Sequence, residues 1–264
     1  MRVYDFEYDG ELLSSKGFII CKFDSSGTDT VTNGSELSFN TVSTQRGAKH
    51  ELTSVAYEDC LTATFQICKH PCYYSVDEIT IEEMRDIMRW LNRKEFHKFS
   101  FTSYEYVNIY FEASFNVNRI EVSGRLCGFE LEMFTNSPFA FYKPVRVDIK
   151  NLVSNGTKTI VSQSDEEGYI YPQMEITMNA SGDLEIYNDI EDRTMFIKNC
   201  KQGEVIKLDY PVIETSLASH KIQNDFNWRF LRIAKTYREN ANHLTISLPC
   251  TIKLTYTPRI KIGL

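Results

Sequence analysis

The sequence predicts a mostly β protein, with an N-terminal β-sandwich or barrel-like domain that contains one helix, followed by a jelly-roll β-sandwich. Apolar side chains recur at every second residue in several segments, which is typical of strands with one face on a core. Aromatic residues make up 13% of the chain, with 15 Tyr and 17 Phe, and flat rings fit the pleated surface of a sheet. Frequent turn signals in the second half favour short strands.

Composition limits the function classes. A chain of 264 residues with 42% hydrophobic side chains can bury roughly 70% of its unfolded surface. The net charge of -7 argues against specific nucleic-acid binding, because phosphate contacts need clustered Lys and Arg. No stretch approaches the roughly 18 apolar residues of a membrane span, and residues 1–7 lack a signal-peptide core. Seven scattered Cys residues fit a reducing compartment. We therefore expect the chain to be made in the cytosol and to stay there until another component carries it elsewhere.

The pattern predicts strands around a single helix in the first half of the chain. The segment Phe18–Phe23 is apolar apart from Lys22. Four further segments alternate between apolar and polar positions: Tyr4, Phe6 and Tyr8; Leu61, Ala63, Phe65 and Ile67; Val107, Ile109, Phe111 and Ala113; Phe129, Leu131 and Met133. Their opposite faces hold polar or charged side chains such as Asn108, Glu112 and Glu130. We therefore expect a sheet with one face on the core.

The helix is expected over residues 80–92. Thr80 and Glu83 form a Thr-x-x-Glu capping box, which marks a helix start. Asn92 is the expected stop. The stripe predicted to face the core consists of Ile81, Met84, Met88 and Leu91. The spacing of three and four residues favours core packing for Trp90 as well.

Two polar segments, Ser25–Glu36 and Thr44–Ser54, are candidate loops or extended hairpin arms. Ser, Thr, Gly and Asp dominate the first, and the second carries Arg46, Lys49 and His50. Such arms would extend beyond the domain core. We expect them to contact neighbouring proteins.

A domain junction is expected near Lys143, because Pro138 and Pro144 interrupt the strand pattern there. The predicted domains are residues 1–142 and 143–264. Apolar alternation continues in the second domain at Met174, Ile176 and Met178; Leu184 and Ile186; Leu244, Ile246 and Leu248; and Ile252, Leu254 and Tyr256. About eight strands of this kind suggest a Greek-key or jelly-roll sandwich.

Cys68, His70 and Cys72, with Cys60 nearby, are the best candidates for a metal site because thiolates and imidazole suit zinc. The triplet lacks the usual paired spacing and has no second half, so buried thiols at a strand end are the favoured interpretation. We expect no cofactor and no metal.

Two acidic groups are candidates for calcium binding or glycoside hydrolysis: Asp165, Glu166 and Glu167, and Asp189, Glu191 and Asp192. Both lie in predicted loops, where charges are normally solvated. The five histidines, His50, His70, His97, His220 and His243, are separated in the sequence, and no nucleophile or phosphate-loop motif is present. We therefore expect no catalytic residues and no enzyme.

Trp228 and Tyr237 are candidates for stacking on a sugar ring. The segment Asn227–Ile233, however, has the pattern of a core strand. Burial of Trp228 is therefore the favoured interpretation.

The residues resemble the distal tail protein family of long-tailed, non-contractile bacteriophages of Gram-positive hosts. The segments that carry the resemblance are Tyr57–Leu61, Phe65–Lys69, Ile87–Leu91, Tyr110–Phe115, Gly128–Ala140, Trp228–Arg232 and Tyr256–Arg259.

The resemblance implies an N-terminal domain that forms a homo-hexameric ring and a galectin-like C-terminal sandwich. It implies a structural role at the virion tail tip, with assembly in the host cytoplasm. Expected partners are the tail tube protein, a tail-associated lysin or central tip protein, and receptor-binding proteins. The alternative is a stand-alone carbohydrate-binding module of the adhesion device.

Overall fold

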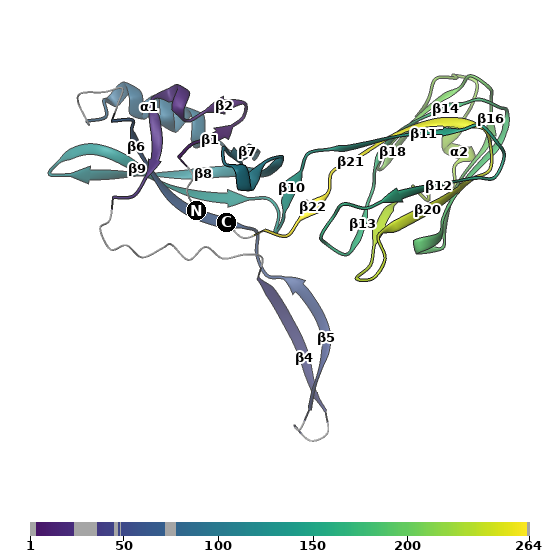
Figure 1. Ribbon diagram of the computed structural model, residues 1–264, viewed down its shortest axis with the longest axis horizontal. Coiled ribbons are helices and arrows are strands. Elements are labelled where there is room, and N and C mark those ends of the chain that lie inside the picture. Colours follow the sequence, from purple (N-terminus) through teal and green to yellow (C-terminus); the bar gives the residue numbers. More distant parts are fainter. Residues whose placement is uncertain (1–3, 24–35, 45–46, 48, 72–77, 263–264) are drawn as a thin grey trace. The chain divides into compact units, whose positions relative to one another are not determined.

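The computed structural model describes residues 4–23, 36–44, 47, 49–71 and 78–262 (Figure 1). The chain divides into two compact units, Met1–Phe141 with Lys261–Leu264, and Tyr142–Ile260. Both are built mainly from strands. The mostly β fold class predicted from the sequence is confirmed.

The first unit contains a large antiparallel sheet. Its strands are β1 (Phe6–Tyr8), β2 (Glu11–Leu12), β3 (Phe18–Cys21), β6 (Thr62–Lys69), β7 (His97–Phe101), β8 (Ile109–Val122), β9 (Arg125–Thr135) and β10 (Ala140–Tyr142). Seven of them run in the order β2-β1-β7-β8-β9-β6-β3, and β10 also pairs with β8. Two short 3-10 turns, Ser14–Lys16 and Tyr104–Tyr106, lie between strands.

The sheet curls until its two ends approach each other. The Ile20 N–H of β3 donates to the Tyr4 carbonyl, just before β1, at 3.0 Å. Rings from distant strands meet inside this curve, since Phe65 lies 5.8 Å from Phe6 and 6.2 Å from Phe99 between ring centroids. The unit is therefore barrel-like, with an aromatic interior.

Helix α1 (Ile81–Leu91) begins as predicted. Thr80 caps it and forms the full capping box with Glu83, and Asn92 is the C-cap. The Lys69 ammonium of β6 lies 2.9 Å from the Glu83 carboxylate, which ties the helix start to the sheet.

The predicted core stripe of α1 is wrong in part. Ile81 is 73% exposed, whereas Ile87, Trp90 and Leu91 are buried. Met84 and Met88 are only partly buried. Trp90 sets the orientation of the helix on the sheet, because its ring stacks on Phe6 at 5.7 Å between centroids and its indole N–H donates to the Tyr8 carbonyl at 3.2 Å.

The second unit is a sandwich of two sheets. One has the order β11-β21-β14-β17-β18, the other β12-β20-β15-β16, and β13 pairs with β19. The strands are β11 (Val145–Asn151), β12 (Gly156–Val161), β13 (Gly168–Ile170), β14 (Gln173–Met178), β15 (Gly182–Asn188), β16 (Arg193–Cys200), β17 (Val205–Asp209), β18 (Val212–Thr215), β19 (Ile233–Lys235), β20 (Ala241–Ile246) and β21 (Cys250–Tyr256). A short helix, α2 (Ile222–Asp225), follows β18, and β22 (Arg259–Ile260) is the last strand.

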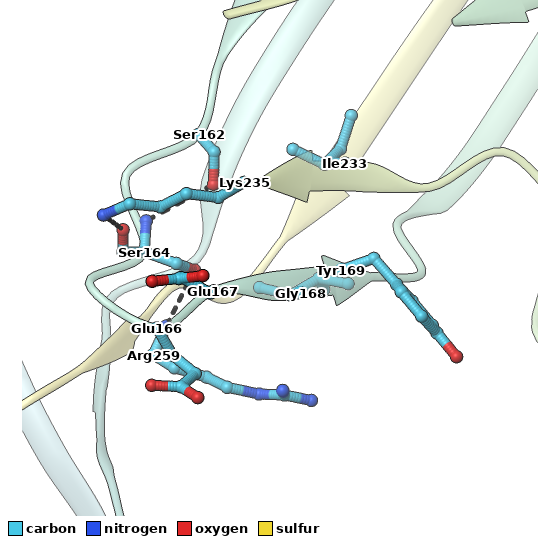
Figure 2. Close-up of a pocket in the computed structure, with 10 residues that line it drawn as sticks. Ser162, Ser164, Glu166, Glu167, Gly168, Tyr169, Ile233, Lys235 and Arg259 are labelled. Carbon is cyan, nitrogen blue, oxygen red and sulfur yellow. Dashed lines mark hydrogen bonds between the residues drawn. The ribbon is translucent and has the colours of Figure 1, made fainter. Parts of the chain in front are cut away.

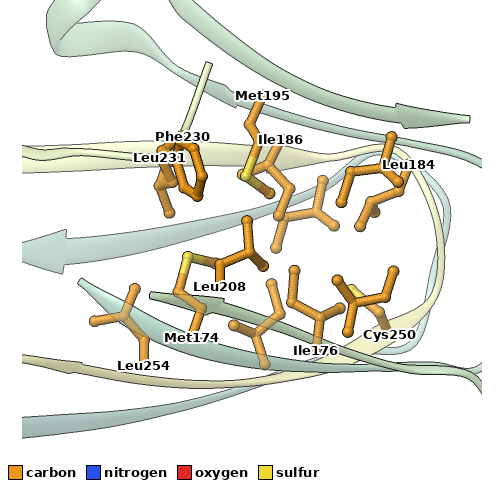
Figure 3. Close-up of a cluster of buried hydrophobic side chains, with 14 of the residues drawn as sticks. Met174, Ile176, Leu184, Ile186, Met195, Leu208, Phe230, Leu231, Cys250 and Leu254 are labelled. Atoms are coloured by element: carbon orange, nitrogen blue, oxygen red, sulfur yellow. The ribbon is translucent and has the colours of Figure 1, made fainter. Parts of the chain in front are cut away.

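Side chains from the two sheets point toward each other in the core (Figure 3). Met174 and Ile176 of β14 face Leu184 and Ile186 of β15, and all four are buried. These are positions at which the sequence alternates, so the predicted strands are found at β14, β15, β20 and β21.

Three sequence expectations are corrected here. Trp228 lies in no core strand; it is exposed, and its φ of 58° is left-handed. Val107 is exposed, and β8 begins only at Ile109. Leu248 lies beyond the end of β20 at Ile246 and is partly buried.

Replacing Phe6 by Ala should destabilise the protein by about 3–5 kcal/mol, because its ring is fully buried and its loss leaves a cavity among other rings. Tyr4→Ala removes an exposed ring two residues away and should change the free energy of unfolding by less than about 0.5 kcal/mol. Urea denaturation of both variants measures the difference. Equal losses would contradict the aromatic interior.

Candidate functional site

A β-hairpin extends from the first unit and pairs with no other strand of the described residues. Its strands are β4 (Leu37–Thr44) and β5 (Lys49–Tyr57), which form a separate two-stranded sheet (Figure 1). The pairing continues one residue beyond the strands at the base, where the Glu58 N–H donates to the Glu36 carbonyl at 3.0 Å. Tyr57 also packs edge-on against Phe139, with 4.6 Å between ring centroids.

Large apolar side chains are exposed along the hairpin. Five of them are between 42% and 60% exposed: Leu37, Phe39, Val42, Leu52 and Val55. Residues that pair directly across two antiparallel strands share a face. Phe39 pairs with Val55, and Leu37 pairs with Tyr57, so these four lie on one face.

A bulge adds Leu52 to the same face. Leu52 and Val55 are three residues apart, so strict alternation would place them on opposite faces. The register shifts between Asn40 and Thr41, and Leu52 then pairs with Thr41 on the Phe39 face. Leu37, Phe39, Leu52, Val55 and Tyr57 therefore form what we call the apolar face of the hairpin.

The opposite face is polar apart from Val42 and Ala56. The Asn40 amide donates to the Ser54 hydroxyl at 3.0 Å, and Lys49 lies 3.5 Å from Glu51. An isolated two-stranded hairpin is marginally stable in water, and an apolar patch on such an element is typical of an interaction site. The hairpin is thus the strongest candidate for a docking surface.

The two predicted polar arms have different outcomes. Thr44–Ser54 forms the hairpin tip and most of β5, apart from residues 45, 46 and 48, which lie outside the described residues. Of the other arm, Ser25–Glu36, only Glu36 is described. Sequence reasoning predicted an arm but missed its apolar face, because Leu52 is out of phase with Val55.

The predicted metal candidates form no such site among the described residues. No group of three or more His, Cys, Asp or Glu side chains in this part of the chain could hold a metal ion. Cys68 and His70 lie at the end of β6, Cys60 precedes β6, and Cys72 lies outside the described residues. Cys68 instead hydrogen-bonds to Cys21 on the neighbouring strand β3.

The second acidic group has structural roles. Asp189 accepts a hydrogen bond from the His243 backbone N–H at 2.9 Å, and Asp192 accepts one from the Tyr187 hydroxyl at 3.1 Å. Glu191 lies 3.3 Å from the Arg232 guanidinium. These carboxylates hold the 3-10 turn Asp189–Glu191 in place rather than facing a shared substrate.

The first acidic group lies beside a small polar pocket (Figure 2). Glu166 and Glu167 line it together with Lys235 and Arg259. The Lys235 ammonium donates to the Ser164 carbonyl at 2.5 Å. The pocket has room for about one water molecule, which is too small for a substrate.

One buried ionisable cluster lies apart from these groups. Glu204 is fully buried, and its carboxylate accepts hydrogen bonds from the Thr215 hydroxyl and from the Lys201 N–H at 2.8 Å. His220 Nδ1 lies 2.6 Å from Glu204, and its Nε2 lies 3.3 Å from Asp225. The cluster joins β17 and β18 to α2.

No helix in the described part of the chain is long and apolar enough to cross a membrane.

Comparisons with known proteins give consistent matches. Residues 1–137 match a family model described as a phage tail protein N-terminal domain, and residues 139–256 match one described as a phage tail C-terminal domain. The chain is also similar to the crystal structure of the SPP1 Dit protein, described as a paradigm of the hub adsorption apparatus in phages that infect Gram-positive bacteria. The TM-score is 0.67 at 11% sequence identity, over 97% of this chain and 99% of that one. At this identity the likeness establishes a shared fold. No curated protein matches the chain.

Glu204→Gln should destabilise the protein at pH 7 by about 1–3 kcal/mol. Burial would raise the pKa of Glu204, but hydrogen bonds from Thr215, Lys201 and His220 outweigh it and hold the pKa below its ordinary value. The stabilisation is therefore present above the ordinary Glu pKa of about 4.3 and is lost as the pH falls through the lower folded-state pKa.

Urea denaturation of the wild type and of Glu204→Gln between pH 3 and pH 7 measures the loss of stability. The difference between wild type and Glu204→Gln should shrink below about pH 4. Glu214→Gln, on the exposed side of β18, is the matched control and should change little. A stability difference between wild type and Glu204→Gln that stays constant with pH would contradict a Glu204 carboxylate stabilised by these hydrogen bonds.

Proposed function

The chain belongs to the phage tail protein family, and from this premise we propose that it is a distal tail protein of a long, non-contractile phage tail. Six copies form a ring through their first units. The ring joins the tail tube to the central tip protein or tail-associated lysin, and receptor-binding proteins attach at its periphery. The resemblance to a phage tail component, drawn first from the sequence, is confirmed by the family models.

The observation that carries the proposal is the apolar face of the hairpin. Phe39, Leu52 and Val55 are exposed on an element that pairs with no third strand in the part of the chain that the structure describes. A neighbouring copy would cover this face and remove it from water. Each copy then offers its hairpin to one neighbour and a different surface to the other, which is the heterologous contact that closes a ring.

The base of the hairpin suits this role. Tyr57 is fixed against Phe139, so the hairpin starts from a defined point on a packed unit. A rigid start lowers the conformational entropy that is lost when the neighbour binds. The hairpin extends outward while Tyr57 at its base stays packed against Phe139 of its own copy.

The proposed role of the protein in the tail is structural and includes no catalytic step. The carboxylates of Asp189, Glu191 and Asp192 are engaged in hydrogen bonds or an ion pair that maintain the second unit. The copies assemble in the reducing cytoplasm of the host, which agrees with the six free cysteines among the described residues. The assembled ring is then part of the virion at the tail tip.

The double variant Phe39→Ser, Leu52→Ser should prevent ring formation, because it removes two of the largest apolar side chains from the contact face. Light scattering should give the mass of a monomer for the variant and of a hexamer for the wild type. Negative-stain images of the same samples should show rings only for the wild type.

The matched control is Val42→Ser, which removes an exposed apolar side chain from the opposite face of the same hairpin. It should leave the ring intact. Rings that survive in the double variant, or that are lost equally in the control, would refute the role of the apolar face. A wild type that stays monomeric at high concentration would instead favour a stand-alone binding module.

A further inference from the structure

Two cysteines from neighbouring strands lie on one face of the curled sheet in the first unit. Cys21 is the last residue of β3, and Cys68 is the last but one of β6. These strands pair antiparallel, with Cys21 opposite Gln66 and Cys68 opposite Ile19. Because residues two apart in a strand point to the same side, Cys21 and Cys68 are diagonal neighbours on a shared face.

This face is the outer one. Ile67 is fully buried, so the residues on either side of it in β6 point away from the core. Cys21 and Cys68 are both partly exposed, whereas Cys200 and Cys250 of the second unit are buried. A small solute can therefore reach the pair on the first unit.

The two thiols are already in contact. Cys21 and Cys68 share a hydrogen bond, and this bond together with burial raises the pKa of the Cys21 thiol above its ordinary value. The thiolate is the species that attacks a disulfide, so the pair reacts slowly at neutral pH. In a reducing cytosol the redox equilibrium also keeps such thiols reduced.

The chain that follows Cys21 is fixed to the same face. The Phe23 N–H donates to the Gln66 side-chain oxygen at 2.8 Å. The Phe23 ring lies over Gly128 of β9, where an added Cβ would be only 2.4 Å from the ring. Gly128 is the residue of β9 that pairs with Cys68. These contacts keep Cys21 beside Cys68, which lowers the conformational entropy that is lost when a bond joins them.

The hairpin β4–β5 lies between the two cysteines in the sequence. On one side β3 pairs with β6 through four residue pairs, and on the other its Ile20 N–H donates to the Tyr4 carbonyl. These contacts are all non-covalent. A bond between Cys21 and Cys68 would close a covalent loop that contains the hairpin, so a force on the hairpin could no longer separate β3 from β6.

We propose that Cys21 and Cys68 form a disulfide in an oxidising medium, and that this bond locks β3 to β6 on either side of the hairpin. The formation of the bond depends only on the two thiols. Its use in the assembled tail rests on the proposed function, because the virion leaves the reducing cytoplasm in which its parts are made.

The oxidant is a small disulfide such as oxidised glutathione. One cysteine thiolate attacks its S–S bond, which releases one reduced glutathione and leaves a mixed disulfide on the protein. The second cysteine thiolate then attacks the protein sulfur of the mixed disulfide and displaces the other glutathione. The two protons and two electrons lost by the cysteines are thus gained by the glutathione pair. Diagonal neighbours are further apart than direct partners, so the end of β3 moves toward β6 as the bond forms.

The first test incubates the full-length protein with oxidised glutathione at about pH 8, where thiolate is more abundant than at neutral pH. Remaining thiols are then alkylated, and peptides are mapped by mass spectrometry without reduction. A linked peptide that contains Cys21 and Cys68 is expected. Cys21→Ser and Cys68→Ser should each abolish it. Cys127→Ser is the matched control, because Cys127 is also partly exposed and lies on the neighbouring strand β9; the linked peptide should persist in this variant.

The second test compares urea denaturation of the oxidised and the reduced protein. Oxidation should raise the midpoint for the wild type and for Cys127→Ser, because the bond restricts the unfolded chain. Dithiothreitol should reverse the shift. Cys21→Ser and Cys68→Ser should show the same midpoint with and without the oxidant.

The oligomeric mass of each sample is measured in parallel. A disulfide between Cys21 and Cys68 in a protein that stays monomeric would refute the ring and leave the thiol pair supported. Intact rings in which no such disulfide forms after prolonged oxidation would do the reverse. A disulfide that joins either residue to another cysteine, or a midpoint that oxidation does not raise, would also overturn the proposed lock.

Discussion

Two antiparallel strands that carry apolar side chains and have no third strand beside them need a partner, and this constraint governs the first unit. The hairpin β4–β5 exposes Phe39, Leu52 and Val55 to water, and no other described strand pairs with it. Contact with another molecule would remove this apolar surface from water and release the corresponding free energy. The proposed assembly would use this surface.

The rest of the first unit provides a fixed base for the hairpin. The curled sheet is filled by rings from several strands, among which Phe6 contacts the helix through Trp90. Lys69 joins β6 to the start of α1. A dense aromatic interior resists deformation, so Phe139, against which Tyr57 packs at the base of the hairpin, belongs to a firmly packed unit. The second unit has its own core between two sheets and can carry a separate surface without disturbing the first.

The sequence predicts those features that local patterns determine. The capping box of Thr80 and Glu83 defines the start of α1, and strict alternation locates β14 and β21 because each has one face on a core. Features set by distant contacts were not predictable. Trp228 looks like a core residue in sequence, and only the bonds from Asn227 to β16 turn it outward. Leu52 joins the apolar face only through a bulge whose position depends on pairing with β4.

The most direct measurement is amide hydrogen exchange of residues 37–44 and 49–57 in assembled and in dissociated protein. The account predicts that these amides exchange rapidly in the monomer, since the hairpin is marginal alone, and become strongly protected in the ring. The control is β14, which lies in a packed core and should be protected in both states. Hairpin amides that exchange equally fast in an intact ring would contradict the central claim.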